Sequence, residues 1–222
     1  MNTELSALDQ WLIDYGFLII VLLFLMLVVI VVGGYWLIRL KLRMMREAKS
    51  ATVWLEKSGS LLDLVEQTRK ENPRQTLNVV LGQGDFSVEK EMVITSPTRF
   101  LGSGVQETRI VAEGRHPAIK IKDAKDCAIS NVRVEGGIHC SNGELLVENC
   151  HIVAQQDGIC IEAHNGSIIT FSGMIRGEGG IAVRAMGESK VILKPPYTVS
   201  GEDYVVLDPK SSITTMKKSN DE

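Results

Sequence analysis

The sequence is poor in aromatic residues and lacks the short motifs that mark common nucleotide sites. Aromatic side chains make up 5% of the 222 residues, and the 24 Lys and Arg residues do not outnumber the 27 Asp and Glu residues. A basic, aromatic-rich surface that binds nucleic acid is therefore not expected. No glycine-rich loop is followed by Lys-Ser or Lys-Thr, so we expect no phosphate-binding loop and no nucleotide cofactor.

The four cysteines lack the spacing of a structural zinc site. Such sites normally contain close ligand pairs, such as two Cys separated by two residues, and no two cysteines lie so close here. The repeat pattern described below places Cys127 and Cys140 in the core, Cys150 at a turn and Cys160 on the outside. We therefore expect no metal and interpret the cysteines as small hydrophobic residues that a reducing cytoplasm keeps as thiols.

Long apolar runs are absent except for one near the N-terminus. No charged residue occurs between Asp14 and Arg39, and the run 17–38 is almost purely apolar. As a helix this run is about 33 Å long, which is enough to cross a bilayer. The residues before it are acidic and it continues into Tyr35 and Trp36, unlike a cleavable signal peptide. We therefore expect a permanent transmembrane helix at 17–38.

The charges on either side of this run predict its orientation. Residues 1–16 contain acidic side chains but no Lys or Arg, whereas basic residues crowd the other side. These basic residues are Arg39, Lys41, Arg43, Arg46 and Lys49. Because flanking cationic residues mark the cytoplasmic side, we expect 1–16 to be a short extracytoplasmic tail and the rest of the chain to be cytoplasmic. The lipid bilayer is thus the first predicted partner.

The segment 39–75 is predicted to contain two helices. The first is a basic juxtamembrane helix that continues from the membrane span. The second begins at Ser60, a suitable N-cap, and ends at Asn72-Pro73, with apolar residues at helical spacing between them. We expect this short helix, 60–72, to cap the domain that follows.

From residue 76 the sequence changes to short β-rich runs separated by Gly, Asn, Asp and Ser. Similar apolar alternations recur about every twenty residues, in AIKIKD, GIHCSN, GICIEA, GIAVRA and YVVLDP. A repeat of this length predicts a solenoid, in which each coil buries its apolar face only against its neighbours. We expect about six or seven coils over 76–216, followed by a polar tail at 217–222.

Aligning the repeats predicts which side chains point inward. The predicted inward columns are Ile121, Cys140, Ile161, Val183 and Leu207; Cys127, Leu145, Ile168 and Val191; and Ile129, Val147, Thr170 and Leu193. Side chains one residue out of phase should point outward, and these are Lys120, His139, Cys160, Ala182 and Val206. Asn131 and Asn149 coincide at a turn, where stacked amides can hydrogen-bond from coil to coil.

These repeats resemble the pectate-lyase-like superfamily of right-handed parallel β-helices, also called the pectin lyase-like fold. The likeness covers roughly 76–214 and lies in the turns Gly82-Gln83-Gly84 and Gly102-Ser103-Gly104 and in the strand, asparagine turn, strand runs CAISNVRVEGGI and LLVENCHIVAQQDGICI. It implies an all-β domain, a right-handed parallel β-helix whose first coil is covered by a helix. In architecture alone the chain is also similar to bactofilins, bacterial cytoskeletal proteins whose small β-helices polymerise end to end. A single-pass protein of the bacterial inner (plasma) membrane is therefore expected.

Enzymes of this superfamily act on polysaccharides through clustered carboxylates, or through Ca²⁺ and a basic residue. The sequence shows neither the paired-aspartate motif of polygalacturonases nor the arginine and acidic calcium cluster of pectate lyases. The best candidate pair is Asp157 and Glu178, because coils about 4.8 Å apart would bring them within the range of a retaining glycosidase pair. Acidic residues are also common at turns simply because turns are solvated.

The predicted function is therefore a non-enzymatic, membrane-anchored scaffold or adaptor. Its cytoplasmic β-helix would bind a protein partner or another copy of itself, with the C-terminal coil, which ends near Met216, as one contact surface. The alternative is a glycan-binding or polysaccharide-processing domain that uses acidic turn residues. That alternative calls for exposed aromatic residues, and after Phe171 the sequence contains only Tyr197 and Tyr204.

Overall fold

The structure is a computed structural model that describes residues 15, 24–28, 32–36, 39, 50–56, 59–73, 75–154 and 158–216. The chain divides into two units, 1–49 and 50–222. In the first unit, 24–28 and 32–36 are helical. Among the described residues, no helix has the length and apolar character needed to cross a membrane. The predicted anchor at 17–38 lies partly outside these residues, and the topology residues after Arg39 lie wholly outside them.

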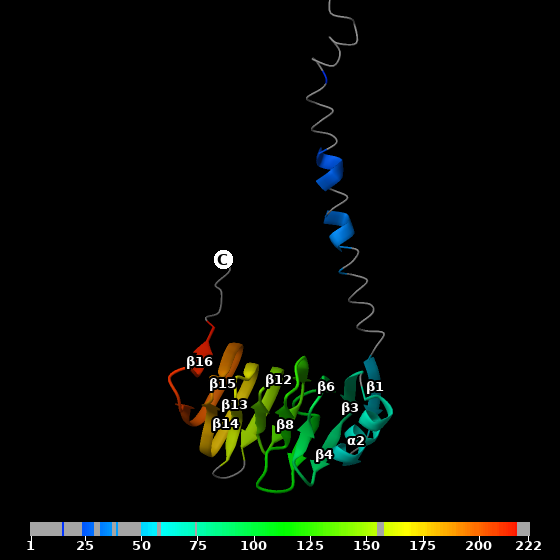
Figure 1. Ribbon diagram of the computed structural model, residues 1–222. Coiled ribbons are helices and arrows are strands. Elements are labelled where there is room, and N and C mark those ends of the chain that lie inside the picture. Colours follow the sequence, from blue (N-terminus) through cyan, green and yellow to red (C-terminus); the bar gives the residue numbers. More distant parts are fainter. Residues whose placement is uncertain are drawn as a thin grey trace, which may run out of the picture. The chain divides into compact units, whose positions relative to one another are not determined.

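The second unit is a parallel β-solenoid of about seven turns (Figure 1). Its strands are β1 (Ser50–Leu55), β2 (Gly59–Ser60), β3 (Thr76–Leu81), β4 (Gly84–Val88), β5 (Met92–Ile94), β6 (Thr98–Gly102), β7 (Thr108–Ala112), β8 (Ile119–Lys122), β9 (Cys127–Ser130), β10 (Arg133–Glu135), β11 (Ile138–Ser141), β12 (Glu144–Ala154), β13 (Ile159–His164), β14 (Ile168–Ala185), β15 (Lys190–Val206) and β16 (Ser212–Thr215). One helix, α2 (Leu61–Glu71), precedes β3. The buried core of this unit comes entirely from residues between Leu61 and Leu193, so the unit contains its own core.

The ladders form three sheets, and each turn of the chain visits them in the same order. Sheet 1 contains β1, β3, β6, β9, the first parts of β12, β14 and β15, and β16. Sheet 2 contains β2, β4, β7, β10 and the following parts of β12, β14 and β15. Sheet 3 contains β5, β8, β11, β13 and the last parts of β14 and β15. One visit to each sheet explains the repeat of about twenty residues.

Helix α2 takes the place of a sheet 3 strand in the first turn. The Ser60 hydroxyl accepts a hydrogen bond from the Asp63 amide at 3.5 Å, and the helix ends at Asn72, as predicted. Its inner face is buried in the core at Leu61 and Val65. Residues of α2 and β5 together line a hollow of about 240 Å³, so the helix lies beside the first strand of sheet 3.

The solenoid begins earlier in the chain than predicted. Strand β1 pairs with β3 from Ser50–Thr76 to Leu55–Leu81, within the segment 39–75 for which only helices were predicted. In β1, half-buried Val53 alternates with exposed Trp54, which is the period of a strand. The strand was missed because it is short and directly follows a stretch of good helix formers.

The predicted inward column that contains Ile121 and Cys140 is displaced by two residues from the predicted alignment. Cys140 pairs with Ile121 on one side, as predicted, but with Ala163 on the other side, where Ile161 was expected. Ile161 pairs instead with Ile138 and Val183. A shift of two residues keeps the same face, so Ile161 is still buried.

A shift of one residue makes another part of the predicted alignment wrong. Leu145 pairs with Ile169 and not with Ile168. Val147 likewise pairs with Phe171 rather than Thr170. Ile169 and Phe171 are fully buried and Ile168 is 40% exposed, because a slip of one residue turns every side chain to the other face. The run from Ile168 to Phe171 consists of four β-forming residues without polar alternation, so the sequence does not indicate which of them point inward.

Asn131 and Asn149 form the predicted amide ladder at the turn between sheets 1 and 2. The Asn149 Nδ2 group donates a hydrogen bond to Asn131 Oδ1 at 2.7 Å. Both residues are in the left-handed region, with φ of 57° and 49°. Asparagine tolerates this conformation better than other residues with a side chain, because its amide bonds locally.

We expect Asn149→Ala to lower the free energy of unfolding by about 1–2 kcal/mol, because it removes the ladder bond and places a poorly suited residue in the left-handed region. Asn149→Gly separates the two causes, since glycine adopts this conformation freely but also lacks the amide. The glycine variant should lose about half as much. Urea unfolding of residues 50–222 measures both losses, and an alanine variant as stable as the parent would contradict the ladder's role.

Candidate functional site

The side chains of the predicted acidic pair, Asp157 and Glu178, lie outside what the structure describes. Asp157 is not among the described residues. Glu178 lies in β14, but its side chain is outside what the structure describes. A carbohydrate site at this pair therefore stays a prediction.

The cysteines are core residues, and one of their predicted positions was wrong. Cys160 was predicted to point outward but is fully buried, and Cys150, directly after the turn residue Asn149, is buried as well. Burial raises the pKa of Cys140 and Cys150 to about 12 and that of Cys160 to about 11, so these thiols are not reactive thiolates. Within the described ranges, no three His, Cys, Asp or Glu side chains are arranged to hold a metal ion.

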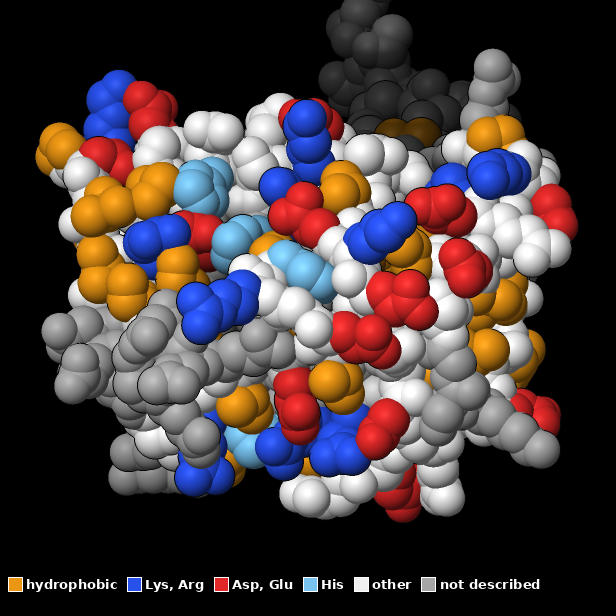
Figure 2. Space-filling view, turned by 90° about the horizontal axis from the view of Figure 1, so that it is seen from below, with side chains coloured by type: hydrophobic (Ala, Val, Ile, Leu, Met, Phe, Trp, Pro, Cys, Tyr) orange, Lys and Arg blue, Asp and Glu red, His pale blue; other side chains and the backbone are white. Residues whose placement is uncertain are grey.

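A buried carboxylate, Glu162, connects three coils on the outer side of sheet 3. It lies in register with His139 of β11 and Arg184 of β14, and its side chain is only 3% exposed. Its Oε2 is 2.8 Å from His139 Nε2, and its Oε1 is 3.0 Å from His164 Nε2. The Arg184 guanidinium also pairs with Oε1. Figure 2 shows histidine side chains gathered beside basic and acidic groups.

The ionisation of Glu162 decides what this cluster can do. Burial opposes the charge, but hydrogen bonds and charges from His139, Arg184 and His164 outweigh it and lower the pKa of Glu162 to about 2. A carboxyl group that is ionised at neutral pH cannot donate a proton as a general acid. Because Glu162 is buried and contacts side chains on the coils before and after its own, we interpret the cluster as a structural tie between coils. Sequence reasoning missed it because its members lie on separate repeats.

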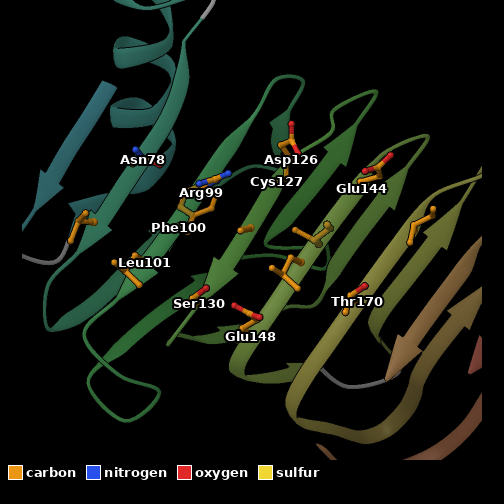
Figure 3. A pocket seen from close by; sticks show the side chains of 15 residues that line it. Asn78, Arg99, Phe100, Leu101, Asp126, Cys127, Ser130, Glu144, Glu148 and Thr170 are labelled. Carbon is orange, nitrogen blue, oxygen red and sulfur yellow. The ribbon is translucent and has the colours of Figure 1, made fainter. Parts of the chain in front are cut away.

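A groove of about 600 Å³ lies on the outer face of sheet 1 (Figure 3). Its apolar lining comes from outward positions of five strands, namely Val80, Leu101, Ala128, Leu146 and Ile168. Figure 3 shows Asp126 and Glu144 at one end of these strands and Glu148 at the other. The one aromatic residue among its lining residues, Phe100, is buried.

The last coil leaves part of the core open. Tyr204 follows Val183 in an inward column of sheet 3, and Val206 follows Ala185 in the next. Val183 and Ala185 are fully buried, whereas Tyr204 is 47% and Val206 45% exposed. Val206 was predicted to point outward, with Leu207 in the column; this is wrong, because the register places Val206 there.

The other sheets are incompletely covered at the same end. Tyr197 and Val199 continue inward columns of sheet 2, and Ile213 continues one of sheet 1, and all three are only partly buried. We call the five residues Tyr197, Val199, Tyr204, Val206 and Ile213 the open end. Among the described residues, β16 pairs only with β15, and no strand follows β15 in sheets 2 and 3. Such edges present backbone groups that can pair with further strands.

Fold and surfaces together define the class of protein: a parallel β-solenoid with an open C-terminal coil and a grooved sheet. No protein-family model and no curated protein matches the chain. Among solved structures, a chain described as Geobacillus virus E2 - ORF18 is similar at 13% identity with a TM-score of 0.45. The match covers 65% of this chain and 33% of the viral one, so this chain spans about a third of that protein. Nothing about function follows from a likeness of this size.

Proposed function

We propose that the chain is a non-enzymatic, membrane-anchored scaffold or adaptor whose solenoid binds a second copy or another protein through the open end. The observation that carries this proposal is the exposure of Tyr204 and Val206 in columns that are buried in every preceding coil. A solenoid without a cap exposes apolar side chains and unpaired strand edges, and association removes both from water.

The remaining parts of the proposal rest on the sequence. The apolar run 17–38 supports a membrane anchor, and the basic residues from Arg39 to Lys49 support a cytoplasmic solenoid in a bacterial inner membrane. The asparagine ladder and the helix in the first turn support a right-handed β-helix of the pectate-lyase-like kind. Right-handed connection is also the general rule for parallel strands.

The test compares two valines that are adjacent in β15 but face opposite ways. We expect the molar mass of residues 50–222, measured by light scattering, to rise with concentration. Val206→Glu should weaken this association at least tenfold, because it places a charge on the apolar surface of the open end. Val205→Glu is the matched control: Val205 is in register with outward-facing Arg184, so it should leave the association unchanged.

The opposite result is equally informative. A parent protein that stays monomeric at every concentration rules out self-association and leaves a different protein as the partner, to be sought by crosslinking the full chain in its membrane. Specific binding or cleavage of a polysaccharide by the same sample would instead support the glycan alternative.

A further inference from the structure

We propose that the groove on sheet 1 is a docking site for a basic amphipathic α-helix of a partner protein. This inference is independent of the open end, which lies on another part of the solenoid. It rests on three properties of the groove: each of its five strands contributes one apolar outward side chain, these strands have no free edge, and carboxylates lie near both ends of the strands.

The outer faces of the three sheets differ in character. On sheet 2, outward Arg109 pairs with Asp85, and Arg133 lies 2.7 Å from Glu135. Sheet 3 likewise carries the Lys120–Glu91 and Arg184–Glu162 pairs. Sheet 1 instead carries an apolar outward side chain on each of the five strands of the groove, among polar ones such as Asn78 and Thr170. Solvated sheet faces do not require apolar side chains, so their concentration on one face marks a contact surface.

The apolar side chains of sheet 1 lie in an oblique band that passes from one outward column to the next. Trp54, Val80 and Leu101 share one outward column, and Trp54 is 69% and Leu101 45% exposed. Leu146 continues the band on the C-terminal side, with Ala128 as its register neighbour. Ile168, exposed by the register described above, extends it to β14. The band therefore crosses the coils obliquely, because Leu101 is in register with Ser130 and Ile168 with Glu144.

An α-helix fits this surface better than an extended peptide. The strands beneath the groove, β3, β6, β9 and β12, each already pair with a strand on both sides, so they offer no edge to an added strand. An extended peptide lying across them would leave its own backbone groups unpaired over an apolar floor, whereas a helix satisfies its backbone internally. Five strands spaced about 4.8 Å apart span about 19 Å, which corresponds to about thirteen helical residues.

Charge determines which helix fits. The groove is lined by the carboxylates of Asp126, Glu144 and Glu148 and by one guanidinium, that of Arg99. Glu144 lies 3.3 Å from Lys125, a highly exposed side chain, so this pair is weak. Lys or Arg residues on the flanks of a helix complement these borders, and acidic flanks oppose them. The same charges disfavour a second copy, because a face-to-face dimer brings like carboxylates together.

A peptide selection on the full chain in an uncharged detergent tests the proposal. The probe is a phage-displayed library of 14-residue peptides with leucine fixed at positions i, i+3, i+4 and i+7 and with flanking positions varied among Lys, Glu and Gln. We expect enrichment of Lys at the flanks. The enriched peptide should bind Leu101→Asp at least tenfold more weakly than the parent, and Glu148→Lys should shift the selection towards Glu.

A control variant tests whether the peptide binds to detergent or to any exposed apolar side chain of the solenoid. Val93 is outward on sheet 3 and 43% exposed, nearly the same as Leu101, so Val93→Asp should bind the peptide as the parent does. The proposal is overturned if no peptide is enriched, if enrichment ignores flank charge, or if Leu101→Asp binds as well as the parent. It is also overturned if Leu101→Asp abolishes self-association, because the occupant is then a second copy. Val206→Glu should leave peptide binding intact, which separates this result from the test of the open end.

Discussion

Glu162→Gln is expected to lower the free energy of unfolding by about 2–4 kcal/mol, which corresponds to about 5–12 °C in melting temperature for a domain of this size. The substitution keeps the size of the side chain but removes the charge that compensates the Arg184 guanidinium and accepts the contacts of His139 and His164. Removing one member of a buried ion pair leaves the others uncompensated. The expected loss is smaller than that for a completely buried ion pair, because 27% of the Arg184 side chain is exposed to water.

A matched control exists on sheet 2. Glu135 also contacts an arginine, Arg133 at 2.7 Å, but it is 26% exposed. Glu135→Gln should therefore cost less than about 1 kcal/mol. Urea unfolding of residues 50–222 at neutral pH measures both variants, and equal losses would show that burial of Glu162 is not the cause.

The pH dependence gives a second measure of the same carboxylate. The pKa of Glu162 is about 2 in the folded chain and near 4.5 for an unperturbed glutamate. A lowered pKa means that the folded state favours the charged form, so its contribution is fully present above pH 4.5 and is lost as pH falls towards 2. The parent should therefore lose stability over this interval more steeply than Glu162→Gln. Parallel curves would contradict the assignment.

Gly137→Ala should destabilise the solenoid by about 2–5 kcal/mol, because two independent costs coincide at this turn before β11. The φ angle of Gly137 is +83°, a conformation that residues with a side chain rarely adopt. An added Cβ atom would lie 2.1 Å from the carbonyl oxygen of Ile159 on the next coil. That oxygen is backbone within the stack, so the coils themselves must separate.

Gly166 provides the control for backbone strain alone. Its φ is +75°, but no heavy atom lies within 4 Å of the position of an added Cβ. Gly166→Ala should therefore cost only about 1 kcal/mol. The difference in unfolding free energy between the two variants, measured in urea, isolates the steric cost of close coil packing; variants of equal stability would exclude it.

The features that could be predicted from the sequence are those that depend on near neighbours or on repetition. The helix α2 was predictable because Ser60 caps its first turn and Asn72 its last turn, both through local hydrogen bonds. The asparagine ladder was predictable because Asn131 and Asn149 occupy the same place in consecutive repeats. The solenoid itself follows from the recurrence of apolar alternation, which needs no knowledge of contacts.

The features that could not be predicted depend on register across coils of unequal length. The run from Ile168 to Phe171 has no alternation, so its phase is set only by pairing with β12. The groove was missed for the same reason, since exposed Ile168 was assigned to the core. Burial of Glu162 results from side chains on β11 and β14 meeting over β13, and no local pattern marks such a convergence.

The position of α2 limits how many copies the open end can join. At the N-terminal side, a helix and not a strand lies beside β5, so a second solenoid cannot continue all three sheets head to tail. At the C-terminal side, all three sheets end in strands. Two copies that use all three sheets must therefore join open end to open end, in an isologous contact about a two-fold axis, and such a contact closes at two copies. An assembly built through this end has a fixed stoichiometry, unlike a filament that grows by subunit addition.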